Sequence, residues 1–69
     1  MPDNRWIGSL VGRLHNAKIT YEELGREAQM TKSYVSMILN GHRNPKEAKE
    51  RLNAAYERIM ARRRAERAS

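Results

Sequence analysis

Residues 19–45, ITYEELGREAQMTKSYVSMILNGHRNP, contain two helix starts in close succession. At the first start, Thr20 is the expected N-cap, and Glu23 three positions later completes a capping box. This pattern predicts a short helix from about residue 21 to residue 29.

The same device is repeated at Thr31, the expected N-cap of a second short helix over residues 32–39. Asn40 and Gly41 then supply a left-handed stop at its C-terminal end. Two short helices joined by a tight turn form the helix-turn-helix pattern.

A helix from about residue 5 to residue 16 is predicted before this pair, with Asp3 or Asn4 as its N-cap. Gly8 and Gly12 fall on one side of it, where they either admit a close backbone or are ordinary surface glycines. The apolar residues share one helical stripe: Trp6, Ile7, Leu10, Val11 and Leu14.

A final long helix is expected to begin after Asn44 as N-cap, with Pro45 in its first position and Glu47 closing a capping box. It extends to about residue 60, and a break near Asn53 would divide it in two. Its apolar positions keep helical spacing: Ala48, Leu52, Ala55, Tyr56, Ile59 and Met60.

The 69-residue chain is expected to be a single domain over residues 1–69, with a core at about 5–60 and a basic extension at 61–69. The net charge is +6, and the extension holds four arginines against one glutamate, which favours a polyanionic partner. Because the extension has no apolar stripe, we expect it to be frayed or disordered without a partner. It is either a solvated end, a phosphate-binding extension, or a dimer-forming or membrane-surface helix.

Nothing in the composition favours catalysis, a metal or a cofactor. The chain has no cysteine, and His15 and His42 lie in different parts of it without a third ligand at metal spacing. The carboxylates of the second helix are expected on its exposed side, where they are solvated: Glu22, Glu23 and Glu27. We therefore expect no enzyme.

The longest charge-free run is far shorter than the roughly 20 apolar residues that a membrane span needs. The opening residues 1–4 also lack the basic and apolar regions of a signal peptide. Both features predict a soluble cytoplasmic protein.

Residues 19–45 closely resemble the Cro and phage-repressor helix-turn-helix family, and with the flanking helices the resemblance covers about residues 5–60. It implies an all-α, lambda-repressor-like helix-turn-helix domain of four to five helices with a long C-terminal helix. The resemblance rests on Thr20, the Glu22-Glu23-Leu24 run, Ala28, the Ser33-Tyr34-Val35-Ser36 segment, Ile38 and the Asn40-Gly41 and Asn44-Pro45 pairs.

Three positions depart from the family's pattern. Tyr21 replaces a common glutamine, Gly25 replaces the usual alanine, and Gln29 replaces the turn glycine. Because that glycine commonly has a positive φ, Gln29 either accepts strain or changes the angle between the two short helices.

The helical wheel of residues 32–39 separates two faces. Val35, Ile38 and Leu39 form the core face, while Ser33, Met37 and Asn40 point the opposite way. This outward face is small and uncharged, and Lys32 lies at the positive end of the helix dipole, where a phosphate or a guanine edge fits.

The resemblance implies base contacts in the major groove from Lys32, Ser33, Ser36 and Met37. It implies contacts near the phosphate backbone from Tyr21, Thr31, Asn40 and Arg43, and we expect Tyr34 and His42 to join them. Other roles remain open: a solvated Lys32, a dimer contact through Met37, a helix-junction cover by Tyr34 and a helix terminator at Asn40.

These features predict sequence-specific binding of double-stranded DNA by a transcriptional repressor or regulator of a phage or mobile element. A homodimer on a palindromic operator is expected, because one such module buries little surface. The alternatives are an antitoxin-like or accessory protein-interaction module on the same scaffold, and a non-specific nucleic-acid binder that uses the arginine tail.

Overall fold

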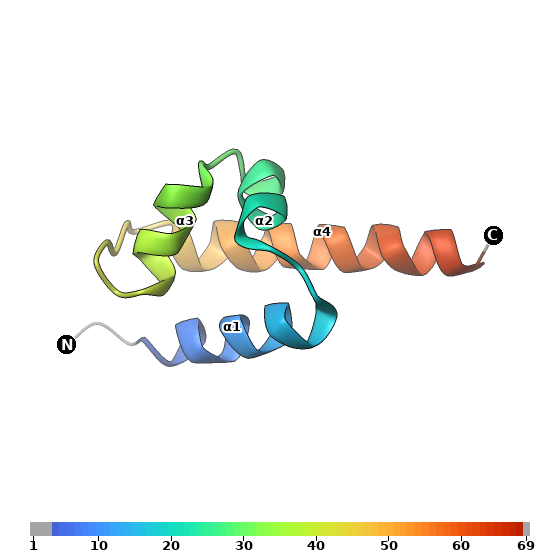
Figure 1. Cartoon of the computed structure of the whole chain (residues 1–69), viewed down its shortest axis with the longest axis horizontal. Coiled ribbons are helices and arrows are strands. Elements are labelled where there is room, and N and C mark those ends of the chain that lie inside the picture. Colours follow the sequence, from blue (N-terminus) through green and yellow to red (C-terminus); the bar gives the residue numbers. More distant parts are fainter. Residues whose placement is uncertain (1–3, 69) are drawn as a thin grey trace.

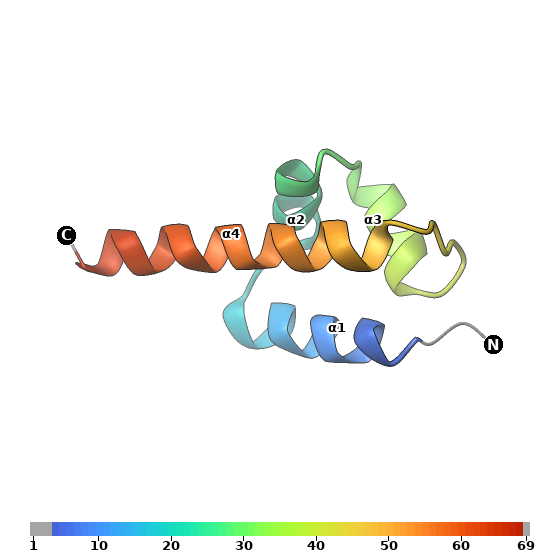
Figure 2. The same ribbon diagram turned by 180° about the vertical axis from the view of Figure 1, so that it is seen from behind.

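The computed structural model describes residues 4–68, which form four helices and no strand. Their bounds are Arg5–Ala17 for α1, Tyr21–Ala28 for α2, Lys32–Leu39 for α3 and Ala48–Ala68 for α4. The long α4 runs beside α1 and α2 and continues past both of them toward the C-terminus (Figures 1 and 2). The predicted all-α helix-turn-helix fold is confirmed, with α3 beside the beginning of α4 (Figure 1).

One apolar core joins the four helices. α4 contributes a stripe along its first three turns, and α1 contributes the inner part of its predicted stripe, while Trp6, Ile7 and Val11 pack half-buried at the edge. Burying each large side chain of this kind stabilises the fold by roughly 1.5–3 kcal/mol. The buried apolar residues are Leu10, Leu14, Ile19, Leu24, Ala28, Val35, Ile38, Leu39, Ala48, Leu52, Ala55 and Ile59.

The N-caps of the two short helices are confirmed. The hydroxyl oxygen of Thr20 accepts from the backbone N–H of Glu23 at 3.0 Å, and that of Thr31 accepts from Tyr34 at 3.0 Å. At α1, by contrast, the side chain of Asn4 makes no capping hydrogen bond, and Asp3 lies outside the described residues.

The predicted start of the last helix is wrong by one turn. Residues 44–45 are not helical, and the N–H of Ala48 donates to the carbonyl of Pro45 at 3.1 Å, closing a turn. The carbonyl of Glu47 then accepts the first helical hydrogen bond, from Arg51 at 2.9 Å. Glu47 therefore stands immediately before α4 and does not close a capping box from inside it.

The predicted end of that helix is also wrong, because α4 continues unbroken through Asn53 and beyond residue 60 to Ala68. The expected fraying of residues 61–69 assumed that only apolar side chains could anchor this segment. Arg62 and Arg63 instead anchor it through hydrogen bonds to α2 and to the end of α1.

α1 and α2 end in the same way. Lys18 and Gln29 follow them with φ values of 58° and 60°, in the left-handed region that glycine usually occupies. After α1, the N–H groups of Lys18 and Ile19 donate to carbonyls of its last turn, and Gln29 and Met30 do the same after α2. This paired bonding is the Schellman motif, which compensates for the strain of a side chain at positive φ.

Candidate nucleic-acid interface

The predicted wheel of α3 is confirmed. Val35 and Ile38 are fully buried and Leu39 is almost so, which fixes the rotation of the helix on the core. The opposite face is exposed at Lys32, Ser33, Met37 and Asn40, and Ser36 is half-buried beside it. Met37, at 37% exposure, is the exposed large apolar side chain among residues 4–68.

A hydrogen bond within α3 joins two residues of this face. The side-chain amide of Asn40 donates to the hydroxyl oxygen of Ser36 at 3.2 Å, one helical turn away. Asn40 therefore fixes the position of the Ser36 hydroxyl and is also the C-cap of α3.

The loop after α3 folds back onto the end of the helix. The N–H groups of His42 and Arg43 both donate to the carbonyl of Met37, at 2.8 and 3.2 Å, and Gly41 makes the turn with a φ of 82°. The side chains of His42, Arg43 and Asn44 are exposed, so this loop presents one cation beside the outer face of α3.

The turn between α2 and α3 depends on two of the departures from the family's pattern. Gln29 has the positive φ that glycine usually adopts at this position. Of the two expected outcomes, backbone strain at Gln29 is therefore the one observed. Gly25 allows the turn to lie close to α2, because a β-carbon at this position would meet the Met30 carbonyl oxygen at 2.6 Å. The sequence pattern identified Gly25 only as a departure and missed this packing role.

The expected phosphate contacts have different surroundings. Thr31, His42 and Arg43 are exposed, whereas Tyr21 and Tyr34 are half-buried against the core. Tyr34 also lines a small notch with Pro45 and Ala48, where α3 meets the beginning of α4. This position gives its ring a packing contact at the helix junction.

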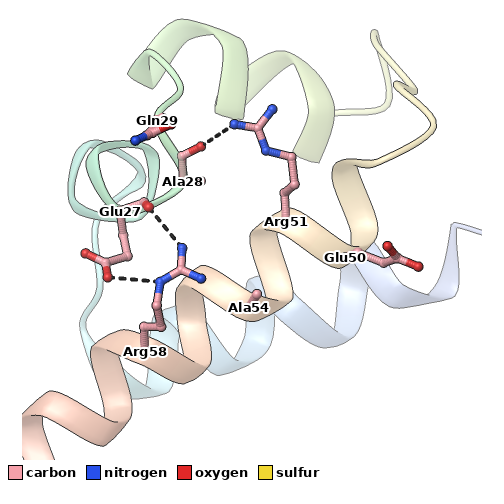
Figure 3. Close-up of a pocket in the computed structure, with 7 residues that line it drawn as sticks. All are labelled: Glu27, Ala28, Gln29, Glu50, Arg51, Ala54 and Arg58. Carbon is pink, nitrogen blue, oxygen red and sulfur yellow. Dashed lines mark hydrogen bonds and ion pairs between the residues drawn. The ribbon is translucent and has the colours of Figure 1, made fainter.

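Arginines of α4 complete the carbonyl end of α2 (Figure 3). Arg51 donates to the carbonyl of Ala28 at 2.7 Å, and Arg58 donates to that of Glu27 at 3.1 Å. Because Met30 and Gln29 bond the carbonyls of Gly25 and Arg26, all four carbonyls of the last turn of α2 have donors. These cations also lie at the negative end of the α2 dipole, a favourable position for positive charge.

Two glutamates of α2 face α4, which contradicts the expectation of solvated carboxylates. Glu27 binds Arg58 at 3.2 Å and Arg62 at 3.4 Å. Glu23 binds Arg63 at 3.3 Å, and the same guanidinium donates to the carbonyl of Ala17 at 2.6 Å. The third carboxylate, that of Glu22, is exposed and pairs with Arg26 along the helix. A sequence signal for these contacts was absent, because the partners are more than thirty residues apart.

The side chain of Glu27 is 21% exposed. Burial raises the pKa of this carboxyl, but the hydrogen bonds and charges of Arg58 and Arg62 together outweigh that effect and leave the pKa below its usual value. Glu27 is therefore held as a carboxylate at neutral pH.

Within residues 4–68, no group of three or more potential ligands is arranged to hold a metal ion. No helix in that part of the chain has both the length and the apolar character to cross a membrane. His15 lies exposed in the last turn of α1, and His42 in the loop after α3.

A family model described as Helix-turn-helix matches residues 13–49, more than half of the chain. The chain belongs to the Cro and phage-repressor family of helix-turn-helix proteins. This is a family of DNA-binding transcription regulators that are typically not enzymes. The match contains α2, the turn, α3 and the loop after it, and it ends at the beginning of α4. No curated protein and no solved structure matches the chain.

Proposed function

We propose that this helix-turn-helix protein binds double-stranded DNA sequence-specifically and acts in the cytoplasm as a transcriptional repressor or regulator of a phage or mobile element. The observation that supports this most is the outer face of α3, which is exposed and carries one lysine but no acidic side chain, while the inner face is packed into the core. A helix of this kind enters the major groove without like-charge conflict or steric obstruction.

In this proposal, Lys32, Ser33, Ser36 and Met37 contact base edges. The phosphate backbone is contacted by two groups of residues. Tyr21 and Thr31 precede α3. The others lie within α3 or after it: Tyr34, Asn40, His42 and Arg43. The position of Thr31 supports its phosphate contact. Thr31 is the N-cap of α3, and the free N–H groups at the start of a helix attract phosphate oxygens.

The proposed assembly is a homodimer on a palindromic operator. A single small module contacts only a few base pairs, and two modules related by a two-fold axis double that contact.

Selection of bound sequences from random duplex DNA tests the proposal. The expected result is one enriched palindrome, bound with two chains per site. Selected pools with no shared sequence would contradict specific recognition, and would favour the protein-interaction module if binding also disappeared in modest salt.

A further inference from the structure

A basic groove lies between the end of α1 and the last turns of α4. Its lining residues are Asn16, Ala17, Lys18, Met60, Arg63, Arg64 and Arg67, of which four are basic and none is acidic. α3 is beside the opposite end of α4 (Figure 1). Arg64 is about 24 Å along the helix axis from Ala48, so the groove is well separated from the outer face of α3.

The groove arises because one face of α4 changes character along its length. This face carries Leu52, Tyr56 and Ile59 where it packs on the core. It continues at helical spacing with Met60, Arg63, Arg64 and Arg67, which line the groove together with the last residues of α1. The face of α4 that is apolar along the core is therefore positively charged along the groove.

Three of the cations in the groove form no ion pair with a carboxylate of the described residues. Arg63 shares the Glu23 carboxylate, but no carboxylate of residues 4–68 forms an ion pair with Lys18, Arg64 or Arg67. The left-handed backbone of Lys18 turns the chain at this point, and its exposed side chain lines the groove. Like charges gathered around one groove repel each other, and an anion between them would relieve that repulsion.

We propose that this groove binds the phosphodiester backbone of nucleic acid, as a second contact separate from α3. Guanidinium groups pair with phosphate oxygens through two parallel hydrogen bonds, and Arg64 and Arg67 are both exposed. The groove has no aromatic side chain for stacking a base, so it fits the backbone alone. The last turns of α4 also lack the apolar face that a membrane surface requires.

The test compares two variants of equal net charge, Arg64→Gln/Arg67→Gln and Lys46→Gln/Lys49→Gln, in the full chain. All four positions are exposed, so both variants keep the core, which circular dichroism checks. With inorganic tripolyphosphate as the probe, the arginine variant is expected to bind at least about tenfold more weakly. The lysine variant is expected to stay within about twofold of the parent chain. An equal loss in both variants would overturn the groove as a site.

A second arm uses duplex DNA of random sequence, so that no operator is needed. The slope of log affinity against log salt is expected to flatten by about 1.8 in Arg64→Gln/Arg67→Gln, from two lost phosphate contacts. An unchanged slope with weakened tripolyphosphate binding would overturn the nucleic-acid assignment in favour of a small oligophosphate. A polyglutamate peptide that binds the groove more tightly than DNA would overturn it in favour of an acidic protein.

This inference does not rest on base recognition by α3. If the base-reading assignment fails, the change of slope on random DNA is still expected. If the groove assignment fails, sequence selection by α3 is unaffected.

Discussion

A β-carbon added at Gly25 would lie 2.6 Å from the carbonyl oxygen of Met30 and 3.2 Å from a methyl carbon of Val35. Backbone atoms cannot yield as a flexible side chain can, so an alanine at this position must push the turn away from α2. The shift would strain the 2.7 Å hydrogen bond from the Met30 N–H to the Gly25 carbonyl. We therefore expect Gly25→Ala to lower the free energy of unfolding by about 1–3 kcal/mol, measured by urea denaturation.

Gly8→Ala and Gly12→Ala are the matched controls. Beyond the adjacent residues and the backbone of α1 itself, neither position has an atom within 4 Å of the added β-carbon, so both are ordinary surface glycines of α1. Each substitution is expected to stabilise the protein by about 0.5–1 kcal/mol, because glycine is unfavourable within a helix. A Gly25→Ala chain as stable as these controls would contradict the close packing of the turn.

The base-reading assignment predicts unequal losses on different DNA. On the selected operator, Lys32→Ala and Met37→Ala are each expected to weaken binding by about 1–3 kcal/mol, with a much smaller loss on random duplex. Fluorescence anisotropy at fixed salt measures both. An equal loss on operator and random DNA would assign these side chains to the backbone or to general charge.

The hydrogen bond between Asn40 and Ser36 predicts a particular base preference. With one hydrogen bond used between them, the Ser36 hydroxyl can still donate to a base, and the second N–H of Asn40 can still donate to a phosphate. A serine hydroxyl can contact several base edges, so the base that it prefers depends on the position in which Asn40 holds it. Sequence selection with Ser36→Ala and with Asn40→Ala is expected to lose the same base preference at one position. Losses at two unrelated positions would show that the residues act separately.

The three shorter helices could be predicted from sequence because their signals are local. Thr20 and Thr31 cap residues three positions away, and the apolar spacing of Leu10, Val35 and Ile38 determines which faces are buried. The exposed face of α3 follows from the same spacing, so the candidate base-reading residues could be named in advance.

The last turns of α4 could not be predicted in this way. In the sequence, Arg58 is a single cation and Arg63 is one member of a basic run, and their roles appear only once the carbonyl ends of α2 and α1 lie beside them in space. The need for glycine at position 25 is likewise set by the position of the Met30 carbonyl, which the turn determines. In both cases a backbone carbonyl is one of the deciding partners, and every residue has a carbonyl, so the sequence pattern does not show which one is used.

The lowered pKa of Glu27 predicts a contribution to acid sensitivity. Since the folded-state pKa is below the unfolded value, this carboxylate stabilises the fold fully above the usual value of about 4.3, and the stabilisation is lost as pH falls through the folded pKa. Thermal melting between neutral pH and about pH 3 is expected to fall less steeply for Glu27→Gln than for the parent chain. Glu22→Gln, which alters only an exposed pair, is expected to follow the parent. Identical profiles for Glu27→Gln and the parent would contradict the assignment.

Arg63 is expected to anchor the last turns of α4, and the adjacent Arg64 provides a control of the same residue type. The Arg63 guanidinium donates to the carbonyl of Ala17 at 2.6 Å and binds Glu23 at 3.3 Å, with about a third of its side chain exposed. Arg63→Ala removes a charged donor from the end of α1 and leaves the Glu23 carboxylate unpaired. With allowance for solvent screening at this exposure, we expect a loss of about 1–2 kcal/mol in urea denaturation. Arg64→Ala, in contrast, is expected to change stability by less than about 0.5 kcal/mol, because the side chain is exposed.

Amide hydrogen exchange locates the effect of Arg63→Ala. Exchange is expected to accelerate in the last turn of α1 and beyond residue 60 of α4 in Arg63→Ala alone. Equal losses in the two variants would mean that helix propensity, and not the contact with Ala17 and Glu23, holds the end of α4 in place.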